Sequence, residues 1–279
     1  MPEPFIGSEA LVAVDVTKTQ LATRYRRLFP NVYLERNTLV NNEFRARAGW
    51  LWSGRRGVVA GFSAAALHGS KWVDDAHAVE LVHDNRRPPP GIKTHADRVS
   101  QDEIALIDGL PVTTPSRTAL DLGCWYPLDE SVAAIDALLA ATDLKVSEGE
   151  LLAERYPGRR GIRRAREALV LADGGAQSPK ETWLRLLLIR AGFPRPQTQI
   201  PVSDEFGEVF AYLDMGWEDL KIAAEYDGEQ HRTNTRRYRW DVRRQEKVER
   251  QGWIDIRVVA GDQEPGIIRR VAAAWARRA

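Results

Sequence analysis

One short stretch near the C-terminal end constrains this 279-residue chain more than any other part of the sequence. Residues 221–228 read Lys-Ile-Ala-Ala-Glu-Tyr-Asp-Gly, an apolar strand pattern that ends in two acids and a glycine. Period-two alternation places Lys221, Glu225 and Asp227 on one face of this strand. Acidic residues are depleted from strands, and a buried charge is costly unless it is paired or binds a metal. The pattern therefore predicts a charged site at the tip of the strand.

A third carboxylate is expected at the same place. Residues 211–214, Ala-Tyr-Leu-Asp, have the pattern of a neighbouring strand that ends in Asp214. Hard divalent cations prefer oxygen ligands, so Asp214, Glu225 and Asp227 on adjacent strands predict a cation site. A structural explanation stays open for Asp214, which at a strand end also suits a turn cap.

Four motifs follow one another between residues 178 and 259. The first is a helix opened by Ser178 and Pro179, with Glu181 in its first turn, and the second is the strand that carries Asp214. The third is the Glu-x-Asp-Gly tip followed by His231, and the fourth runs from Asp-Val-Arg-Arg (241–244) to Gly-Trp-Ile-Asp-Ile-Arg-Val (252–258). This ordered set resembles the PD-(D/E)xK nuclease fold, and within it the branch of very-short-patch-repair (Vsr) endonucleases.

The resemblance implies a restriction-endonuclease-like αβββαβ core that hydrolyses phosphodiesters. Asp214, Glu225 and Asp227 would hold Mg²⁺ or Mn²⁺, and Glu181 would reach the site from the first helix. His231 would act as an acid–base or phosphate-orienting group. A metal ion fits this chemistry because it lowers the pKa of bound water and neutralises charge on the phosphate. Two structural alternatives remain, a helix-terminal role for Glu181 and a loop histidine for His231.

One position departs from the usual motif, which ends in lysine where this chain has Asp227. The Vsr-like branch also lacks that lysine, so the departure leaves the identity of the general base open. Lys221 and Arg244 are expected to hold the nucleic-acid strand, although Arg244 lies in an arginine-rich run that also suits a solvated helix face. Arg257 is expected to pair with a carboxylate of the site.

The first half of the chain contains two further motifs. Residues 62–69 read Phe-Ser-Ala-Ala-Ala-Leu-His-Gly, and residues 107–122 follow the order turn, strand, helix N-cap and helix. Together they resemble the abortive-infection type IV (AbiEi-like) antitoxins, in which a small winged-helix domain precedes an α/β region. The resemblance implies a DNA partner and a toxin partner. The mixed α/β fold class predicted for the chain then divides into a degenerate winged helix at 1–40, an α/β region at 41–173 and the nuclease-like domain at 178–279.

Near the N-terminus, residues 18–28 are predicted to form a helix with Leu21, Tyr25 and Leu28 on one face. Its arginines are the candidate phosphate contacts of a DNA-binding N-terminal segment, since arginine pairs bidentately with phosphate. These residues are Arg24, Arg26 and Arg27. A solvated helix face is the alternative explanation for the same three side chains.

Composition narrows the function classes further. The net charge of +1 excludes a polycationic nucleic-acid coat, so any DNA contact comes from local basic patches. The single cysteine excludes an internal disulfide and a cysteine zinc site. The sequence shows neither a signal-peptide pattern nor an apolar run long enough to span a membrane, so we expect a cytoplasmic protein without a membrane partner.

Metal-dependent hydrolysis of nucleic acid, with DNA as the expected substrate, is the function that the sequence favours. The alternative from a different class is a DNA-binding regulator or antitoxin-like protein whose nuclease fold is catalytically inactive. A protein-interaction module without nucleic acid is a third reading, consistent with the near-neutral net charge. Substrate sequence, DNA versus RNA and oligomeric state stay open at this point.

Overall fold

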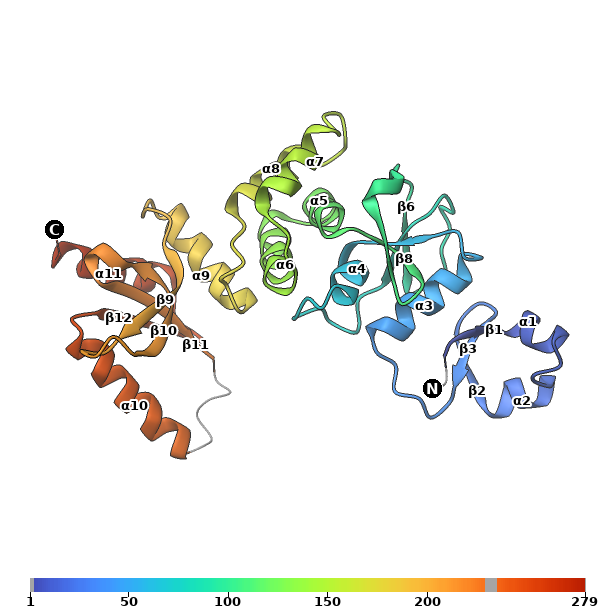
Figure 1. Cartoon of the computed structure of the whole chain (residues 1–279), viewed down its shortest axis with the longest axis horizontal. Coiled ribbons are helices and arrows are strands. Elements are labelled where there is room, and N and C mark those ends of the chain that lie inside the picture. The colour runs from blue at the N-terminus through green and yellow to red at the C-terminus, as the bar shows by residue number, and fades with distance from the viewer. Residues whose placement is uncertain (1–2, 229–234, 279) are drawn as a thin grey trace. The chain divides into compact units, whose positions relative to one another are not determined.

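The computed structural model describes residues 3–228 and 235–278, with residues 235–242 described by their backbone alone. Within these ranges the chain contains eleven α-helices and three β-sheets, which confirms the predicted mixed α/β class (Figure 1). The chain divides into two compact units, Met1–Val170 (unit 1) and Leu171–Ala279 (unit 2). No helix among the described residues is both long and apolar enough to cross a membrane.

Unit 1 begins with a small segment built on a three-stranded sheet of order β1-β3-β2. Its elements are β1 (Phe5–Ile6), α1 (Gly7–Val12), α2 (Lys18–Thr23), β2 (Tyr25–Phe29) and β3 (Val32–Glu35). The predicted helix over residues 18–28 is wrong beyond Thr23, because residues 25–29 form a strand antiparallel to β3. Asn31, with φ at +61°, makes the tight turn between the two strands. Strand pairing thus overrides the helical spacing of the sequence.

The rest of unit 1 is a five-stranded sheet followed by helices. The sheet has the order β6-β5-β4-β8-β7, and α3 and α4 contribute to the core packed against it. The strands are β4 (Val58–Val59), β5 (Val79–Val82), β6 (Ile92–His95), β7 (Ile104–Ile107) and β8 (Leu110–Thr113). The helices are α3 (Asn42–Trp52), α4 (Gly61–Leu67), α5 (Pro115–Trp125), α6 (Leu128–Ala141), α7 (Val146–Glu154) and α8 (Ile162–Leu171), with a short 3₁₀ turn, η1 (Gln101–Glu103), before β7.

A buried ionic network ties α5 to the surrounding loops of unit 1. Arg117 and Asp121 are fully buried and form an ion pair at 2.8 Å on one face of α5. Arg159 reaches Asp121 at 2.6 Å, and Arg117 also pairs with the buried carboxylate of Glu103. Buried charges are tolerated only when they are paired in this way, so the network has a structural role.

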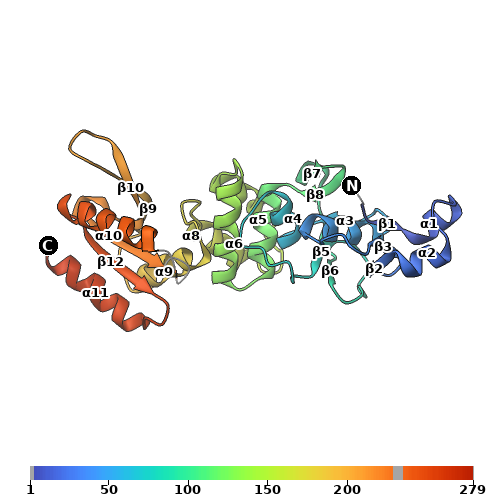
Figure 2. The ribbon, with the colours of Figure 1, turned by 90° about the horizontal axis from the view of Figure 1, so that it is seen from below.

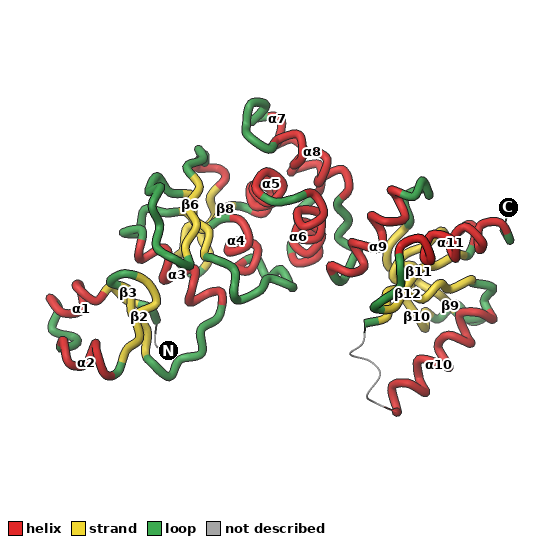
Figure 3. The backbone as a smooth tube through the Cα atoms, turned by 180° about the vertical axis from the view of Figure 1, so that it is seen from behind, coloured by secondary structure: helices red, strands yellow, loops and turns green. Residues whose placement is uncertain are grey.

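Unit 2 is a four-stranded sheet with helices on both faces (Figure 3). Its elements are α9 (Pro179–Arg190), β9 (Gln197–Ser203), β10 (Val209–Trp217), the 3₁₀ turn η2 (Glu218–Leu220), β11 (Ile222–Asp227), α10 (Thr235–Arg250), β12 (Ile254–Val259) and α11 (Glu264–Ala276). The sheet has the order β12-β11-β10-β9, with β11 and β12 parallel and the other pairs antiparallel. Figure 2 shows the turn between β9 and β10 projecting from the sheet.

Two apolar cores cover the two faces of this sheet. Ile222, Ala224 and the half-buried Tyr226 belong to the core formed with α9 and α11. Ala223 belongs to the other core, which includes Val248 of α10. The period-two alternation predicted for β11 is therefore confirmed, and Glu225 lies on the same face as Ala223, toward α10.

Candidate active site

The site is built where β10 and β11 stop pairing. Their last paired residues at this end are Met215 and Ala224, which brings Asp214 opposite Glu225. The backbone N–H of Tyr226 donates to Oδ2 of Asp214 at 2.9 Å, so a carboxylate takes the place of a backbone acceptor. The strands begin to separate at this point, and two acids from neighbouring strands lie side by side.

The close approach of β10 and β11 beside this site depends on Gly216. A Cβ atom at that position would lie 2.2 Å from the carbonyl oxygen of Ile222, closer than any real side chain allows. The glycine therefore lets the two strands pair tightly just before they separate at Asp214.

Glu181 enters from the first turn of α9. Its carboxylate accepts hydrogen bonds from the hydroxyl of Ser178 at 2.9 Å and from the backbone N–H of Gln177 at 2.8 Å. The hydroxyl of Ser178 in turn accepts from the backbone N–H of Glu181, as in a capping box. The helix-terminal role left open by the sequence is thus present, and the carboxylate is also buried.

The carboxylates of Glu181, Asp214 and Glu225 are close enough to perturb one another. Burial, together with the charges of Glu181 and Glu225, raises the pKa of Asp214 to about 7. Burial also raises the pKa of Glu181, with a smaller contribution from Glu225. Glu181, Asp214 and Glu225, which come from α9, β10 and β11, therefore lie within electrostatic reach of one another.

Glu225 differs from its neighbours because arginine neutralises it. Arg244 of α10 donates to both oxygens of Glu225, at 2.7 and 3.2 Å, and to the carbonyl of Tyr212 at 2.5 Å. Arg257 of β12 lies 3.9 Å from the same carboxylate, which confirms the predicted pairing of Arg257 with an acid of the site. Arg244, expected to hold a nucleic-acid strand, is engaged with Glu225 in this structure.

Asp255 of β12 is a member of the cluster that sequence reasoning missed. Its side chain is 2% exposed, and Oδ2 lies 3.4 Å from Nε of Arg257. Its other oxygen, Oδ1, is buried without a hydrogen-bond partner. Burial, together with the charge of Glu225, raises the pKa of Asp255 to about 7. The sequence does carry a signal for Asp255, because acidic residues are depleted from strands and Asp255 lies inside the strand 254–259, as Glu225 lies inside its own strand.

The other predicted residues of unit 2 lie apart from this cluster or outside the described residues. Asp227 ends β11, and its side chain makes no hydrogen bond or ion pair with a described residue. Lys221 precedes β11 at the end opposite Glu225, and its ammonium group donates to the carbonyl of Gln251 at 2.8 Å. His231 falls outside the described residues.

The metal site expected from the sequence requires several ligands in one place. Among residues 3–228 and 235–278, no group of three or more His, Cys, Asp or Glu side chains is arranged to hold a metal ion. Asp214, Glu225 and Asp227 are therefore not assembled into one ligand set here. The carboxylates that do approach each other are those of Glu181, Asp214, Glu225 and Asp255.

The three arginines predicted as phosphate contacts do not share a helix. Arg24 follows α2 as its C-terminal cap residue, whereas Arg26 and Arg27 belong to strand β2. Arg24 and Arg27 are exposed, and Arg26 donates to the carbonyl of Thr38. Alternation along β2 points Arg26 and Arg27 to opposite sides, so a single three-arginine helix face is wrong.

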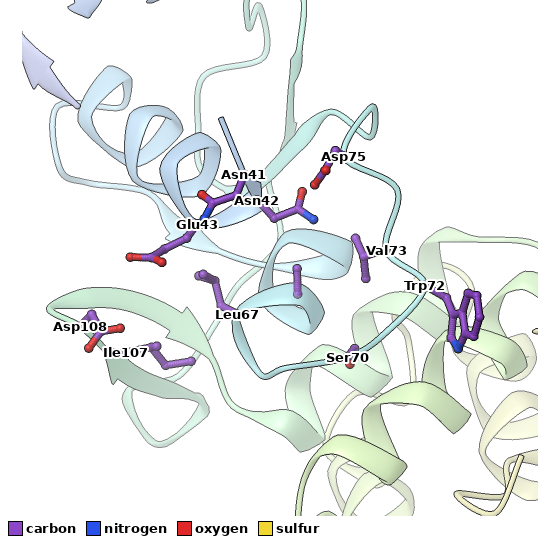
Figure 4. A pocket seen from close by; sticks show the side chains of 11 residues that line it. Asn41, Asn42, Glu43, Leu67, Ser70, Trp72, Val73, Asp75, Ile107 and Asp108 are labelled. Carbon is purple, nitrogen blue, oxygen red and sulfur yellow. The ribbon is translucent and has the colours of Figure 1, made fainter. Parts of the chain in front are cut away.

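Unit 1 contains a pocket of about 350 Å³ next to the start of α3 (Figure 4). Three acids line it, and no lysine or arginine does; its side chains are Asn41, Asn42, Glu43, Ala66, Leu67, Ser70, Trp72, Val73, Asp75, Ile107 and Asp108. This acidic lining does not suit a nucleic-acid phosphate. The pocket therefore differs in charge from the cluster of unit 2, which contains arginines.

Comparison with known proteins places the chain beside two proteins of Mycobacterium tuberculosis. They are "Uncharacterized protein MT2308" of strain CDC 1551 / Oshkosh and "Uncharacterized protein Rv2248" of strain ATCC 25618 / H37Rv. Each is 32% identical over 219 residues, which cover 77% of this chain and 78% of the relative. The chain belongs to their family. Neither name states an activity, and no protein-family model matches the sequence.

Proposed function

We propose that unit 2 is a nuclease of the Vsr-like PD-(D/E)xK type that hydrolyses phosphodiester bonds, with DNA as substrate. The observation that carries the proposal is the convergence of Glu181, Asp214 and Glu225 where β10 and β11 separate. The succession of elements from α9 through β12 also supports the restriction-endonuclease-like αβββαβ core that the sequence resemblance implies. Clustered acids with perturbed pKa values are typical of catalytic sites.

A divalent cation, Mg²⁺ or Mn²⁺, is part of this proposal. The donor chemistry fits, because one oxygen of Asp214 has no hydrogen-bond partner among the described residues and carboxylates suit hard cations. The arrangement fits less completely, because Arg244 is bonded to both oxygens of Glu225. A cation bound at Glu225 would therefore have to share these oxygens with Arg244, since each oxygen keeps one further lone pair. When bound, the cation would supply Lewis acidity toward water and phosphate.

The chain's own residues have separate parts in the proposed reaction. Arg244 and Arg257 lie beside the acids and would stabilise negative charge on a bound phosphodiester. The charge of Glu181 would help to keep the pKa of Asp214 raised, and Glu181 would assist the proposed hydrolysis from α9. His231 is retained as a candidate acid–base group on the strength of the sequence resemblance alone.

A specific observation favours a second candidate, a DNA-binding regulator whose nuclease fold is inactive. The ion pair between Glu225 and Arg244 neutralises the acid that the proposed reaction needs. In that case the N-terminal segment, two short helices followed by the β2–β3 hairpin, would act as the degenerate winged helix of an AbiEi-like protein. Arg24 and Arg27 would contact phosphate, and a toxin would be the protein partner.

Cleavage of plasmid and short oligonucleotides with Mg²⁺, Mn²⁺ or EDTA tests the proposal. We expect metal-dependent cutting by the native chain and its loss in Asp214→Asn and Glu225→Gln. Asp219→Asn is the matched control, since this acid is exposed in η2 outside the cluster. Cutting that survives both site substitutions would remove the proposed site. Salt-sensitive DNA binding without cutting by the native chain would establish the regulator instead.

A further inference from the structure

A second pocket, of about 370 Å³, lies along the free edge of the unit 2 sheet. Strand β12 is the outermost strand of that sheet, and its residues 254–257 form the floor of the pocket. Helix α11 provides most of the wall, and Gln245 of α10 lies at the other side. The remaining lining residues are Arg270, Ala273, Ala274 and Arg277. The pocket adjoins the acidic cluster, because Asp255 and Arg257 belong to both.

On the α11 side, the pocket is lined by two arginines with two alanines between them. Residues 270, 273, 274 and 277 are spaced i, i+3, i+4 and i+7, so they follow one face of α11. Arg270 and Arg277 stand about two helical turns apart, roughly 10 Å, and the exposed residue between them, Ala273, has only a methyl side chain, whereas Ala274 packs in the core. Three arginines and one acid line the pocket, so its charge favours an anionic ligand.

The three arginines differ in what they already bind. Arg257 is shared between Asp255 and Glu225, and Arg270 pairs with Asp262 at 2.5 Å. Arg277 is exposed, and its side chain makes no hydrogen bond or ion pair with a described residue. Arg277 is thus the guanidinium in this pocket whose five donors remain available to a ligand.

The same edge is closed to an added peptide strand. Ile254 donates its N–H to the carbonyl of Lys221, so its backbone groups face the β11 side of the strand. The backbone groups of residues 255, 257 and 259 therefore face the free edge. At that edge Arg270 donates to the carbonyl of Arg257 at 2.8 Å, and Asp262 accepts from the N–H of Val259 at 3.1 Å. Side chains of this chain therefore occupy the positions that a docking strand would need.

We propose that Arg277, assisted by Arg270, binds a phosphate group of a nucleic-acid strand that passes through the site of unit 2. The phosphate bound here is distinct from the one beside Glu225, and Asp255 with Arg257 connects the two positions. Planar guanidinium groups match phosphate oxygens bidentately, and the small side chain of the exposed Ala273 between the arginines leaves space for the sugar-phosphate chain. This inference rests on the proposed nucleic-acid substrate, but it does not require cleavage.

Fluorescence anisotropy with a labelled single-stranded oligonucleotide, in EDTA, tests this binding without cutting. We expect Arg277→Gln in the full chain to weaken binding about fivefold and to reduce the slope of log K against log salt by about 0.7. Arg277→Lys keeps the charge and should therefore keep the native salt slope, while it binds less tightly than the native protein because lysine cannot pair bidentately with phosphate. Arg269→Gln is the matched control, because it removes the same charge from an exposed position of α11 that does not line the pocket.

The source of the phosphate is tested by competition with adenosine monophosphate and inorganic phosphate. Displacement of the oligonucleotide only by a large excess of either competitor supports a strand as the ligand. Tighter binding of a free competitor than of the oligonucleotide would overturn it, as would equal losses in Arg277→Gln and Arg269→Gln. Failure of cleavage alone, with the Arg277-dependent binding intact, would remove the proposed reaction and leave the phosphate site.

Discussion

Replacing Asp214 by asparagine is expected to stabilise unit 2 at pH 8, whereas replacing Glu225 by glutamine is expected to destabilise it. The two acids lie opposite each other but have different partners. Asp214 is half-buried beside two other carboxylates, and its pKa is raised to about 7. Glu225 is neutralised by Arg244 at 2.7 Å. If the two substitutions change the stability of unit 2 in opposite directions, the charge of Asp214 is uncompensated and that of Glu225 is compensated.

The magnitude for Asp214 follows from its pKa. A carboxyl whose folded pKa exceeds its unfolded value stabilises the folded state fully only at low pH, and loses that contribution as pH rises through the folded pKa. The difference between the ordinary value of 3.8 and about 7 sets an upper limit of about 4 kcal/mol. Solvent screening at a half-buried side chain reduces this to about 1–2 kcal/mol. Asparagine retains an oxygen that can accept from Tyr226, so that hydrogen bond survives.

The expected loss for Glu225→Gln is about 2–3 kcal/mol, because Arg244 would keep its charge in a site where its side chain is 15% exposed. Hydrogen–deuterium exchange of peptides covering β10 and β11, in EDTA at pH 5 and pH 8, measures both changes locally. The stabilisation by Asp214→Asn should be larger at pH 8 than at pH 5. Destabilisation by Asp214→Asn at pH 8, or a gain that is equal at both pH values, would refute the reasoning.

Two further substitutions test the packing of each unit. Asp121→Asn in unit 1 should cost about 3 kcal/mol, because it leaves Arg117 and Arg159 buried with one carboxylate fewer; urea unfolding measures the loss, and a change below about 0.5 kcal/mol would contradict it. Gly216→Ala in unit 2 should disrupt the pairing of β10 with β11, since its Cβ would meet the carbonyl of Ile222 at 2.2 Å. Unchanged exchange protection in β11 would show that the strands accommodate the methyl group.

The sequence predicted the parts of this fold that depend on local pattern. Alternation in β11 and the capped start of α9 both follow from nearest neighbours and residue type. The helix over residues 18–28 was wrong because strand β2 forms only through its partner β3. No local periodicity reports that pairing, so helical spacing dominated the prediction.

For the site as well, the residues that a local pattern marks could be predicted from the sequence, whereas the contacts that depend on long-range pairing could not. Asp214 and Glu225 stand out as acids in or beside apolar strands, whereas Glu181 was expected at the site from the family resemblance. Asp255 has the same signal, but its approach to Glu225 depends on the parallel register that sets Ala223 opposite Asp255. The pairing of Glu225 with Arg244 depends on how α10 crosses the sheet, and a sequence carries no direct record of that crossing.

The acids whose pKa values are raised, rather than the fully paired Glu225, are the strongest argument that this cluster has a function. The burial of Glu225 needs no functional explanation, because Arg244 compensates its charge. Asp214 forms no ion pair with a described residue, and burial together with the charges of Glu181 and Glu225 raises its pKa to about 7. Asp255 pairs with Arg257 through Oδ2, but its Oδ1 is buried without a hydrogen-bond partner, and burial together with the charge of Glu225 raises its pKa to about 7. Apolar side chains of similar size would make unit 2 more stable at these positions. Groups that lower stability in this way are characteristic of sites where activity requires them, which is why the exchange experiment on Asp214 bears on function as well as on folding.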